Sequence, residues 1–218
     1  KRVVGLEDGK LVIREDYLSQ QPETTGTESV TDASDPAINY DGTALACLGD
    51  TGRSLYFLSG GKGQYLVKNK KMTAPSFDSF GWLWVAESDG AVRAYNAAST
   101  NEKERSKGIE IPVSWRSGMT FSSLRISHDG ARVVVVGTRD GTAAVVMSGV
   151  VRDSSGTPKG FTEPVRVTSS ITPRTAVWAG EQNLVVVNDK TGESEVTTLS
   201  GEETKFDRLD GVKSVSAG

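Results

Sequence analysis

Histidine and cysteine are almost absent from this sequence, which contains one of each, His128 and Cys47, among 218 residues. A single cysteine cannot form an internal disulfide bond. It lies in the apolar run Ala44–Leu48, where we expect it to behave as a small buried hydrophobic residue. A nucleophilic thiol needs a nearby base, and a metal site needs several ligands. We therefore expect no catalytic cysteine, no metal centre and no cofactor.

Long apolar runs and an excess of basic residues are also missing. No stretch of about 18 apolar residues occurs, so no membrane-spanning helix is predicted, and no signal peptide opens the chain. The net charge is −3, which gives no reason to expect a nucleic-acid partner. The sequence contains no HExxH, Walker, GxSxG, EF-hand or CxxC pattern. Because the first residue is Lys1, not Met, we expect a piece of a longer protein.

One unit is repeated four times along the chain. A fixed repeat is the strongest guide to the fold, so it is considered before other patterns. In each copy a short apolar segment ends in a turn, an apolar run of about five residues follows, and a second turn leads into an alternating strand. The copies are Ile38–Leu58, Ser76–Tyr95, Leu124–Met147 and Ala176–Leu199.

Glycine marks both turns of each copy, and aspartate accompanies it in every turn except the first turn of the fourth copy. The two turn glycines of a copy are 9 to 12 residues apart. Only glycine, asparagine and aspartate adopt positive φ at low cost, so Asp-Gly pairs between apolar runs predict hairpins. An aspartate in such a turn is expected to accept backbone N–H groups, which is a structural role and not a catalytic one. As structural turn residues we assign Asp41, Gly42, Asp78, Gly81, Asp129 and Gly130 in the first turn, and Asp89, Gly90, Asp140 and Gly141 in the second.

The apolar runs predict an all-β fold. Runs such as Val133–Val136 and Leu184–Val187 are rich in β-branched residues and too short for helices. No segment of helical length has a period of 3.6. A continuous apolar strand must be covered on both faces, so each repeat is expected to be a small sheet between its neighbours. Radial stacking of such sheets is a β-propeller. We predict one domain over residues 1–218 with four-stranded antiparallel blades at 36–69, 73–95, 120–150 and 171–200.

The two ends of the chain resemble parts of the same unit. Residues 1–15 match its second half, and residues 208–218 are predicted as a partial blade, in which Ser214–Gly218 could supply a first strand to the N-terminal blade. The chain would then contain about five blades, and six are possible in the intact protein. The insertions Asn96–Gly108 and Arg152–Pro164 are predicted to be loops, as is Gln20–Asp35.

Tryptophan residues are the first candidates for binding chemistry. Trp82 and Trp84 share one face of one strand, and we expect both to fill the core against the next blade. Trp115 lies between repeats and is followed by Arg116. Because Trp and Arg are enriched among residues that dominate interfaces, Trp115 and Arg116 are predicted to bind a partner. A tryptophan that merely covers a blade edge is the alternative.

Acidic residues leave a second functional class open. A glycosidase needs two carboxyl groups about 5–10 Å apart, and a glycan-binding surface needs exposed aromatic rings. The turn acids considered for this are Glu87, Asp89 and Asp140. Two hypotheses follow: a protein-binding module that is not an enzyme, and a carbohydrate-binding or glycan-active propeller at the cell envelope.

Two blocks of sequence carry a family resemblance. The blocks APSFDSFGWLWV (Ala74–Val85) and LRISHDGARVVVV (Leu124–Val136), in this order, resemble the C-terminal β-propeller domain of the LpqB lipoprotein family, with TolB-like or WD40-like repeats. Phe77 stands where the family usually has tryptophan. The matching residues are Ser76, Asp78, Gly81, Trp82, Trp84, Leu124, Arg125, Ser127, Asp129, Gly130 and Arg132.

The resemblance implies a cellular context. It implies an exported actinobacterial lipoprotein on the outer face of the cytoplasmic membrane, whose lipid anchor lies outside this chain. It also implies a protein partner, the extracellular part of the sensor histidine kinase of the MtrAB two-component system, and hence a role in cell-wall homeostasis and cell division. It implies no catalytic residue. We expect the domain to be a monomer.

Overall fold

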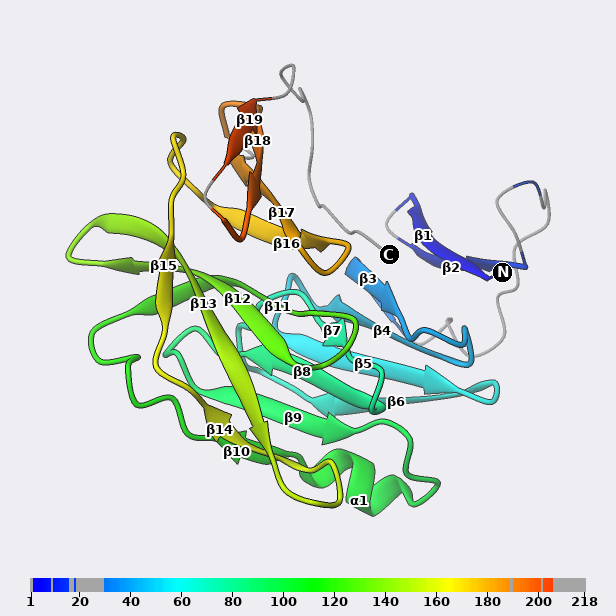
Figure 1. Cartoon of the computed structure of the whole chain (residues 1–218). Coiled ribbons are helices and arrows are strands. Elements are labelled where there is room, and N and C mark those ends of the chain that lie inside the picture. The colour runs from blue at the N-terminus through cyan, green and yellow to red at the C-terminus, as the bar shows by residue number, and fades with distance from the viewer. Residues whose placement is uncertain are drawn as a thin grey trace.

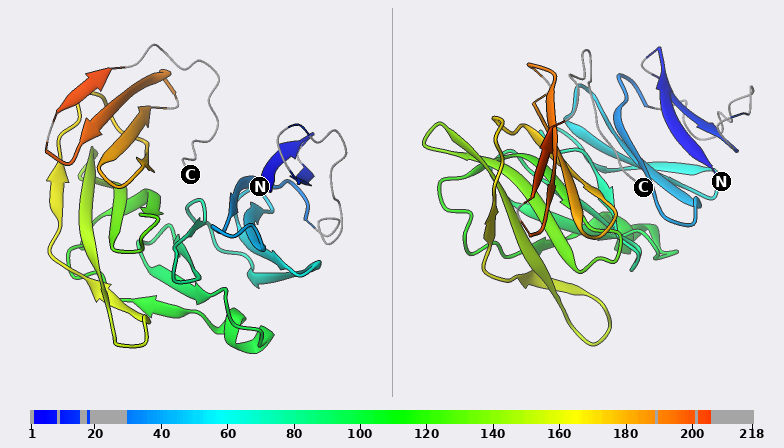
Figure 2. Two further views of the ribbon diagram at one scale, coloured as in Figure 1. Left: turned by 45° about the vertical axis from the view of Figure 1, so that its right-hand side comes forward. Right: turned by 45° about the horizontal axis from the view of Figure 1, so that its top comes forward.

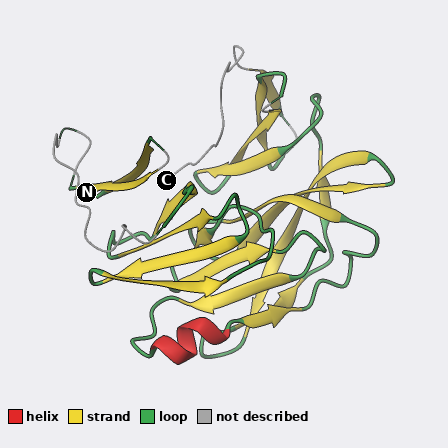
Figure 3. Cartoon of the chain, turned by 180° about the vertical axis from the view of Figure 1, so that it is seen from behind, coloured by secondary structure: helices red, strands yellow, loops and turns green. Residues whose placement is uncertain are grey.

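The computed structural model of the chain describes residues 2–8, 10–15, 18, 30–188, 190–200 and 202–205. These residues form nineteen strands and one helix of six residues (Figure 3). The strands make four larger antiparallel sheets and one two-stranded sheet. The sheets follow one another around an arc as the blades of a β-propeller (Figures 1 and 2), which confirms the predicted fold class. No helix in the described part of the chain is long and apolar enough to cross a membrane.

Each blade is built from strands that pair in chain order. Blade 1 contains β3 (Ser34–Ile38), β4 (Ala44–Gly49), β5 (Ser54–Ser59) and β6 (Lys62–Val67). Blade 2 contains β7 (Ser76–Phe77), β8 (Trp82–Ala86), β9 (Val92–Asn96) and β10 (Ile109–Ile111). Blade 3 contains β11 (Thr120–Ile126), β12 (Arg132–Arg139), β13 (Thr142–Arg152) and β15 (Val165–Val167), with β14 (Pro158–Phe161) paired to the far end of β13. Blade 4 contains β16 (Thr175–Ala179), β17 (Asn183–Asn188), β18 (Glu193–Thr198) and β19 (Glu203–Lys205). A two-stranded sheet, β1 (Val3–Glu7) and β2 (Lys10–Arg14), precedes blade 1.

The hydrophobic core lies between the blades. Successive side chains of a strand point to opposite faces of its sheet, so one apolar run serves two interfaces. In β8, Leu83 and Val85 pack with blade 1. Trp82, Trp84 and Ala86 pack with blade 3. The predicted packing of both tryptophans against the next blade is therefore confirmed.

The valine run of β12 divides in the same way. Val133 and Val135 pack with blade 2, whereas Val134 and Val136 pack with blade 4. The prediction of sheets that are apolar on both faces is therefore confirmed. Cys47 is fully buried between blade 1 and the β1–β2 sheet, as predicted. Burial raises the pKa of its thiol to about 12, so this cysteine is unreactive at neutral pH.

The Asp140–Gly141 turn shows why the repeat needs these residue types. Both residues have positive φ, 49° and 76°, and they connect the paired residues Arg139 and Thr142 as a two-residue hairpin. A side chain larger than that of Gly, Asn or Asp is strained in this conformation.

Two turn glycines allow the energetic cost of side-chain crowding to be separated from the cost of backbone strain. An alanine Cβ at Gly130 would lie 2.8 Å from the ring of Phe80 and 3.0 Å from a guanidinium nitrogen of Arg152, whereas at Gly141 it would meet nothing within 4 Å. Both glycines have positive φ. We expect Gly141→Ala to lower the free energy of unfolding by about 1 kcal/mol through backbone strain, and Gly130→Ala by about 2–3 kcal/mol because overpacking is added. Urea unfolding measures both, and equal losses would contradict the predicted crowding at Gly130.

One predicted loop contains the helix. Within Asn96–Gly108, residues Glu102–Lys107 form α1, and the side chain of Asn101 caps it by accepting the N–H of Lys103 at 3.0 Å. The expectation of no helix was therefore wrong here. Six residues are too few to produce a recognisable helical period, and the asparagine cap is a local signal.

The other predicted loop, Arg152–Pro164, contains a hairpin. Strand β13 runs on to Arg152 and pairs with β14, and the turn is closed by Asp153, which accepts the N–H groups of Ser155 and Thr157. Because strands follow both insertions, blade 2 extends to residue 111 and blade 3 to residue 167. These limits lie beyond the predicted ends at 95 and 150.

The described residues contain four complete blades and a two-stranded part of another. Residues 1–15 were predicted as a partial blade, and β1 and β2 lie there. The predicted partial blade at 208–218, with its closing strand Ser214–Gly218, lies outside the described residues, as does most of the predicted loop Gln20–Asp35.

Candidate interaction face

The turns after the first strands of blades 1, 2 and 3 meet on one face of the propeller. The rings of Tyr40 and His128 make an edge contact with centroids 4.4 Å apart. The N–H of Ser79 donates to the carbonyl oxygen of His128 at 3.0 Å. Next to Ser79, the ring of Phe80 lies against Gly130. We call Tyr40, Phe80 and His128 the aromatic rim.

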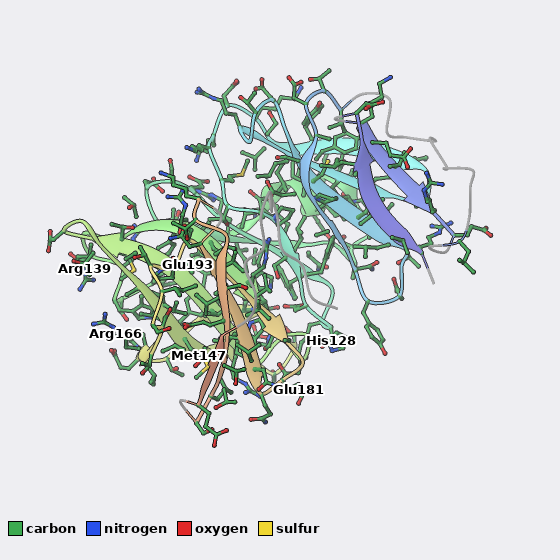
Figure 4. The ribbon with its side chains drawn as sticks, turned by 90° about the horizontal axis from the view of Figure 1, so that it is seen from above. His128, Arg139, Met147, Arg166, Glu181 and Glu193 are labelled. Carbon is green, nitrogen blue, oxygen red and sulfur yellow. The ribbon has the colours of Figure 1, made fainter. Side chains whose placement is uncertain are left out.

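The aromatic rim is open to solvent. Tyr40 is 70% exposed and Phe80 is 52% exposed, and His128 is exposed as well. In Figure 4, His128 lies near Glu181, whose carbonyl oxygen accepts a hydrogen bond from Arg132. Exposed aromatic side chains gathered in one place are typical of binding surfaces.

Asp78 holds the turn of blade 2 beneath the rim. Its carboxylate is fully buried. Oδ1 accepts the backbone N–H groups of Phe80 and Trp82, at 3.0 and 2.9 Å. Oδ2 accepts the indole N–H of Trp84 at 2.8 Å and a guanidinium N–H of Arg152 at 2.6 Å. One carboxylate thus connects the first turn of blade 2, the core tryptophan and the β13–β14 hairpin.

Arg152 holds Phe80 in place. Its guanidinium lies 4.4 Å from the centre of the Phe80 ring, a cation–π contact. It also donates to the carbonyl oxygens of Gly130 and Gly156, at 3.1 and 2.9 Å. Because the Arg152 side chain is only 11% exposed, this part of the rim is fixed before any partner binds.

Two charged aspartates flank the rim. Hydrogen bonds from the hydroxyl and N–H of Thr43 lower the pKa of Asp41. Burial acts to raise the pKa of Asp129, but hydrogen bonds from Ser127 and Ala131 outweigh it, so this pKa is also lowered. A lowered folded-state pKa means that each group stabilises the fold above the ordinary carboxyl range, and that this contribution is lost as the pH falls through the folded value.

Trp115 and Arg116 lie at the other end of the blades. The carbonyl oxygen of Trp115 accepts a hydrogen bond from Arg139, and Arg139 and His128 lie at opposite ends of blade 3 (Figure 4). The Trp115 ring is half-buried and packs on Phe121 and Phe161, with centroids 6.0 and 6.3 Å away. Partner binding by Trp115 and Arg116 stays a prediction, and it concerns a face different from that of the aromatic rim.

The three acids considered for glycan chemistry have separate surroundings. Glu87 is buried and forms ion pairs with Lys70 and Arg93, each at 2.8 Å. Asp89 accepts a backbone N–H within its turn, and Asp140 is exposed at a hairpin tip. A pocket of about 460 Å³ between the β1–β2 sheet and blade 1 is lined by none of the three. In the part of the chain that the structure describes, no three His, Cys, Asp or Glu side chains are placed to hold a metal ion.

Sequence reasoning missed most of this face. Tyr40 and His128 precede their turn glycines by two residues and Phe80 precedes its own by one, so exposed rings before turn glycines were a signal available in the repeat. Arg152 carried no such signal. It is 74 residues from Asp78, and only the packing of blade 3 on blade 2 brings them together.

Sequence comparisons place the chain in a known group. A family model described as the lipoprotein LpqB beta-propeller domain matches residues 9–217. Proteins named lipoprotein LpqB from Streptomyces avermitilis and Streptomyces coelicolor are each 27% identical to the chain, over 171 and 177 residues, which is 72% of this chain. The chain spans 27% of the length of each of these relatives.

Solved structures share the fold. A putative TolB from Agrobacterium tumefaciens aligns with a TM-score of 0.67 and 14% identity, over 94% of this chain and 76% of that one. An auxiliary nutrient binding protein from Bacteroides thetaiotaomicron aligns at 0.62 and 11%, over 94% and 54%. Virginiamycin B lyase from Staphylococcus aureus aligns at 0.58 and 10%, over 97% and 67%. At such identities the likeness concerns the fold alone.

The repeat, the inter-blade core and the extent of the family match agree with the two sequence blocks that first indicated a resemblance. The chain belongs to the LpqB lipoprotein β-propeller family.

Proposed function

We propose that this chain is a non-enzymatic protein-interaction domain of an exported lipoprotein and that the aromatic rim binds the partner. The observation that carries the proposal is that Tyr40, Phe80 and His128 come from three successive blades and stand exposed together. Aromatic anchors on a rigid support supply much of the energy of protein interfaces, because little conformational freedom is lost on binding. The Asp78–Arg152 pair provides that support.

The partner we propose is the extracellular part of the sensor histidine kinase of the MtrAB two-component system. Membership of a lipoprotein family supports a location outside the cytoplasm. There, a lipid anchor outside this chain would hold the parent protein on the outer face of the cytoplasmic membrane, near such a kinase. The role would be to modulate signalling in cell-wall homeostasis and cell division.

Removing two rim rings tests the proposal. We expect Tyr40→Ala with Phe80→Ala to weaken binding of the full-length lipoprotein to the kinase ectodomain at least tenfold, because two exposed anchors are lost. Calorimetry or biolayer interferometry measures the affinity, and circular dichroism checks that the fold is kept. Val165→Ala is the matched control, since Val165 is 60% exposed and lies in blade 3, outside the rim.

The outcome separates the two faces of the propeller. An unchanged affinity of the rim variant, together with a loss in Trp115→Ala, would move the interface to the opposite face. Loss in neither variant would contradict protein binding through either surface.

A glycan-binding role is the second candidate, because the same exposed rings could stack on sugars. Thermal shifts with a panel of cell-wall glycans test it, and a shift that disappears in the rim variant would support it. Hydrolysis is less well supported, since the Glu87 carboxylate is held in ion pairs with Lys70 and Arg93.

A further inference from the structure

Arg125 lies where the first strands of three blades converge. It belongs to β11, the first strand of blade 3, and the first strands of neighbouring blades contact one another. Its Nη1 donates to the carbonyl oxygens of Ala74 and Pro75, at 2.7 and 3.1 Å, in the segment that enters β7 of blade 2. Asp35, on β3 of blade 1, is close enough to act electrostatically on the guanidinium. The charged group therefore lies among the first strands, which form the inner edge of the blades.

The charge of Arg125 lacks a close counter-ion among the residues that the structure describes. Two other partly buried arginines are paired directly with carboxylates: Arg152 with Asp78 at 2.6 Å, and Arg93 with Glu87 at 2.8 Å. No carboxylate of the described residues lies within 4 Å of Arg125, which has only the two carbonyl oxygens as hydrogen-bond partners. Buried charges are normally paired, since burial without a counter-ion is costly. Burial accordingly lowers the pKa of Arg125, and Asp35 opposes this only partly.

Two guanidinium nitrogens of Arg125 remain available. Nε and Nη2 form no hydrogen bond within the described residues, and Arg125 is partly exposed. These two nitrogens are therefore open to a ligand at the inner edge of the blade. A guanidinium presents its N–H groups as a planar fork, which matches the two oxygens of a carboxylate or phosphate.

We propose that the ring axis beside Arg125 is an anion-binding site for a carboxylate or phosphate group. The oxyanion accepts hydrogen bonds from Nε and Nη2 and supplies the missing counter-charge, while Nη1 keeps its bonds to Ala74 and Pro75. The site uses none of the side chains of the aromatic rim and does not depend on a protein partner, so it can be tested with the isolated chain.

Titration calorimetry with two probes tests the site. Inorganic phosphate and glutarate are titrated into the chain at constant ionic strength, with sodium chloride as the reference. We expect at least one probe to bind, and Arg125→Gln to weaken its binding at least tenfold. Phosphate binding alone identifies a phosphate site, and glutarate binding identifies a carboxylate site. Arg53→Gln, which changes an exposed arginine, is the control and should bind like the parent chain.

Asp35→Asn separates anion binding from a purely structural role of Arg125. Asp35 has a φ of 50°, a conformation that asparagine also tolerates. Removing its negative charge should strengthen anion binding about three- to tenfold, an effect that loss of packing cannot produce. The proposal is overturned if neither probe binds more than chloride does, if Arg125→Gln binds as tightly as the parent, or if Asp35→Asn does not strengthen binding.

Discussion

Replacing Asp78 by alanine is expected to lower the free energy of unfolding by about 3–5 kcal/mol, because the buried guanidinium of Arg152 then lacks its counter-ion. Arg152, whose side chain is 11% exposed, loses the only carboxylate that pairs with it among the described residues. The N–H groups of Phe80, Trp82 and Trp84 lose their acceptor at the same time. Unsatisfied donors of this kind add to the loss.

Urea unfolding of two further variants checks the cause of that loss. Asp78→Asn keeps the shape and some hydrogen bonding, so we expect a smaller loss of about 1–3 kcal/mol. Asp89→Ala is the matched control, since Asp89 accepts one backbone N–H in a turn, and about 1 kcal/mol is expected. A loss in Asp78→Ala no larger than in Asp89→Ala would show that the buried pair contributes little.

A double-mutant cycle with Arg152→Met isolates the link between blades 2 and 3. Removing both charged partners should cost less than the sum of the single changes, with a coupling energy of about 1–3 kcal/mol. Additive losses would mean that Asp78 acts only within its own turn. The coupling energy therefore measures how much the Asp78–Arg152 pair stabilises the contact between the β13–β14 hairpin and blade 2.

Trp84→Ala is expected to cost about 3–5 kcal/mol, the range for deleting a large buried aromatic side chain. Trp84 is fully buried in the cluster between blades 2 and 3, and its ring lies 6.0 Å from that of Phe161. The loss of its indole N–H also removes one donor from Asp78. Urea or thermal unfolding measures the effect.

Trp115→Ala is the comparison for Trp84→Ala. The Trp115 ring is only half-buried, and its indole nitrogen has no hydrogen-bond partner among the described residues, so we expect about 1–2 kcal/mol. Equal losses in the two variants would contradict the assignment of Trp84 to the centre of the interface. The same Trp115 variant serves in the partner-binding measurement, where it reports on the opposite face.

The repeat predicted much of the fold because its signals are local. A turn with positive φ needs glycine or aspartate, and a strand covered on both faces needs an uninterrupted apolar run. These two requirements led to the blades, to the burial of Cys47 and to the shared face of Trp82 and Trp84. The insertions carried no repeat signal, so α1 and the β13–β14 hairpin were missed.

The candidate site was less accessible to sequence reasoning. Trp115 and Arg116 were selected for residue type and position, but exposure depends on what packs above them, and Phe121 and Phe161 cover part of the Trp115 ring. Glu87 was considered as a free acid, but Lys70 and Arg93, which pair with it, are recognisable only once the strands are aligned.

The sequence alone determined that this chain forms short antiparallel sheets stacked in a circle. Each repeat contains the glycine and aspartate residues that form its turns and the apolar runs that must be buried on both faces. Tertiary structure alone decided which turns meet on one face, that Asp78 is paired with a residue 74 positions away, and that Arg125 lies among the first strands with no close carboxylate in the described part of the chain. The physical reason is that turn and strand preferences act over a few residues. The contacts that make a binding surface form between blades, where the distance along the chain carries no information about the distance in space.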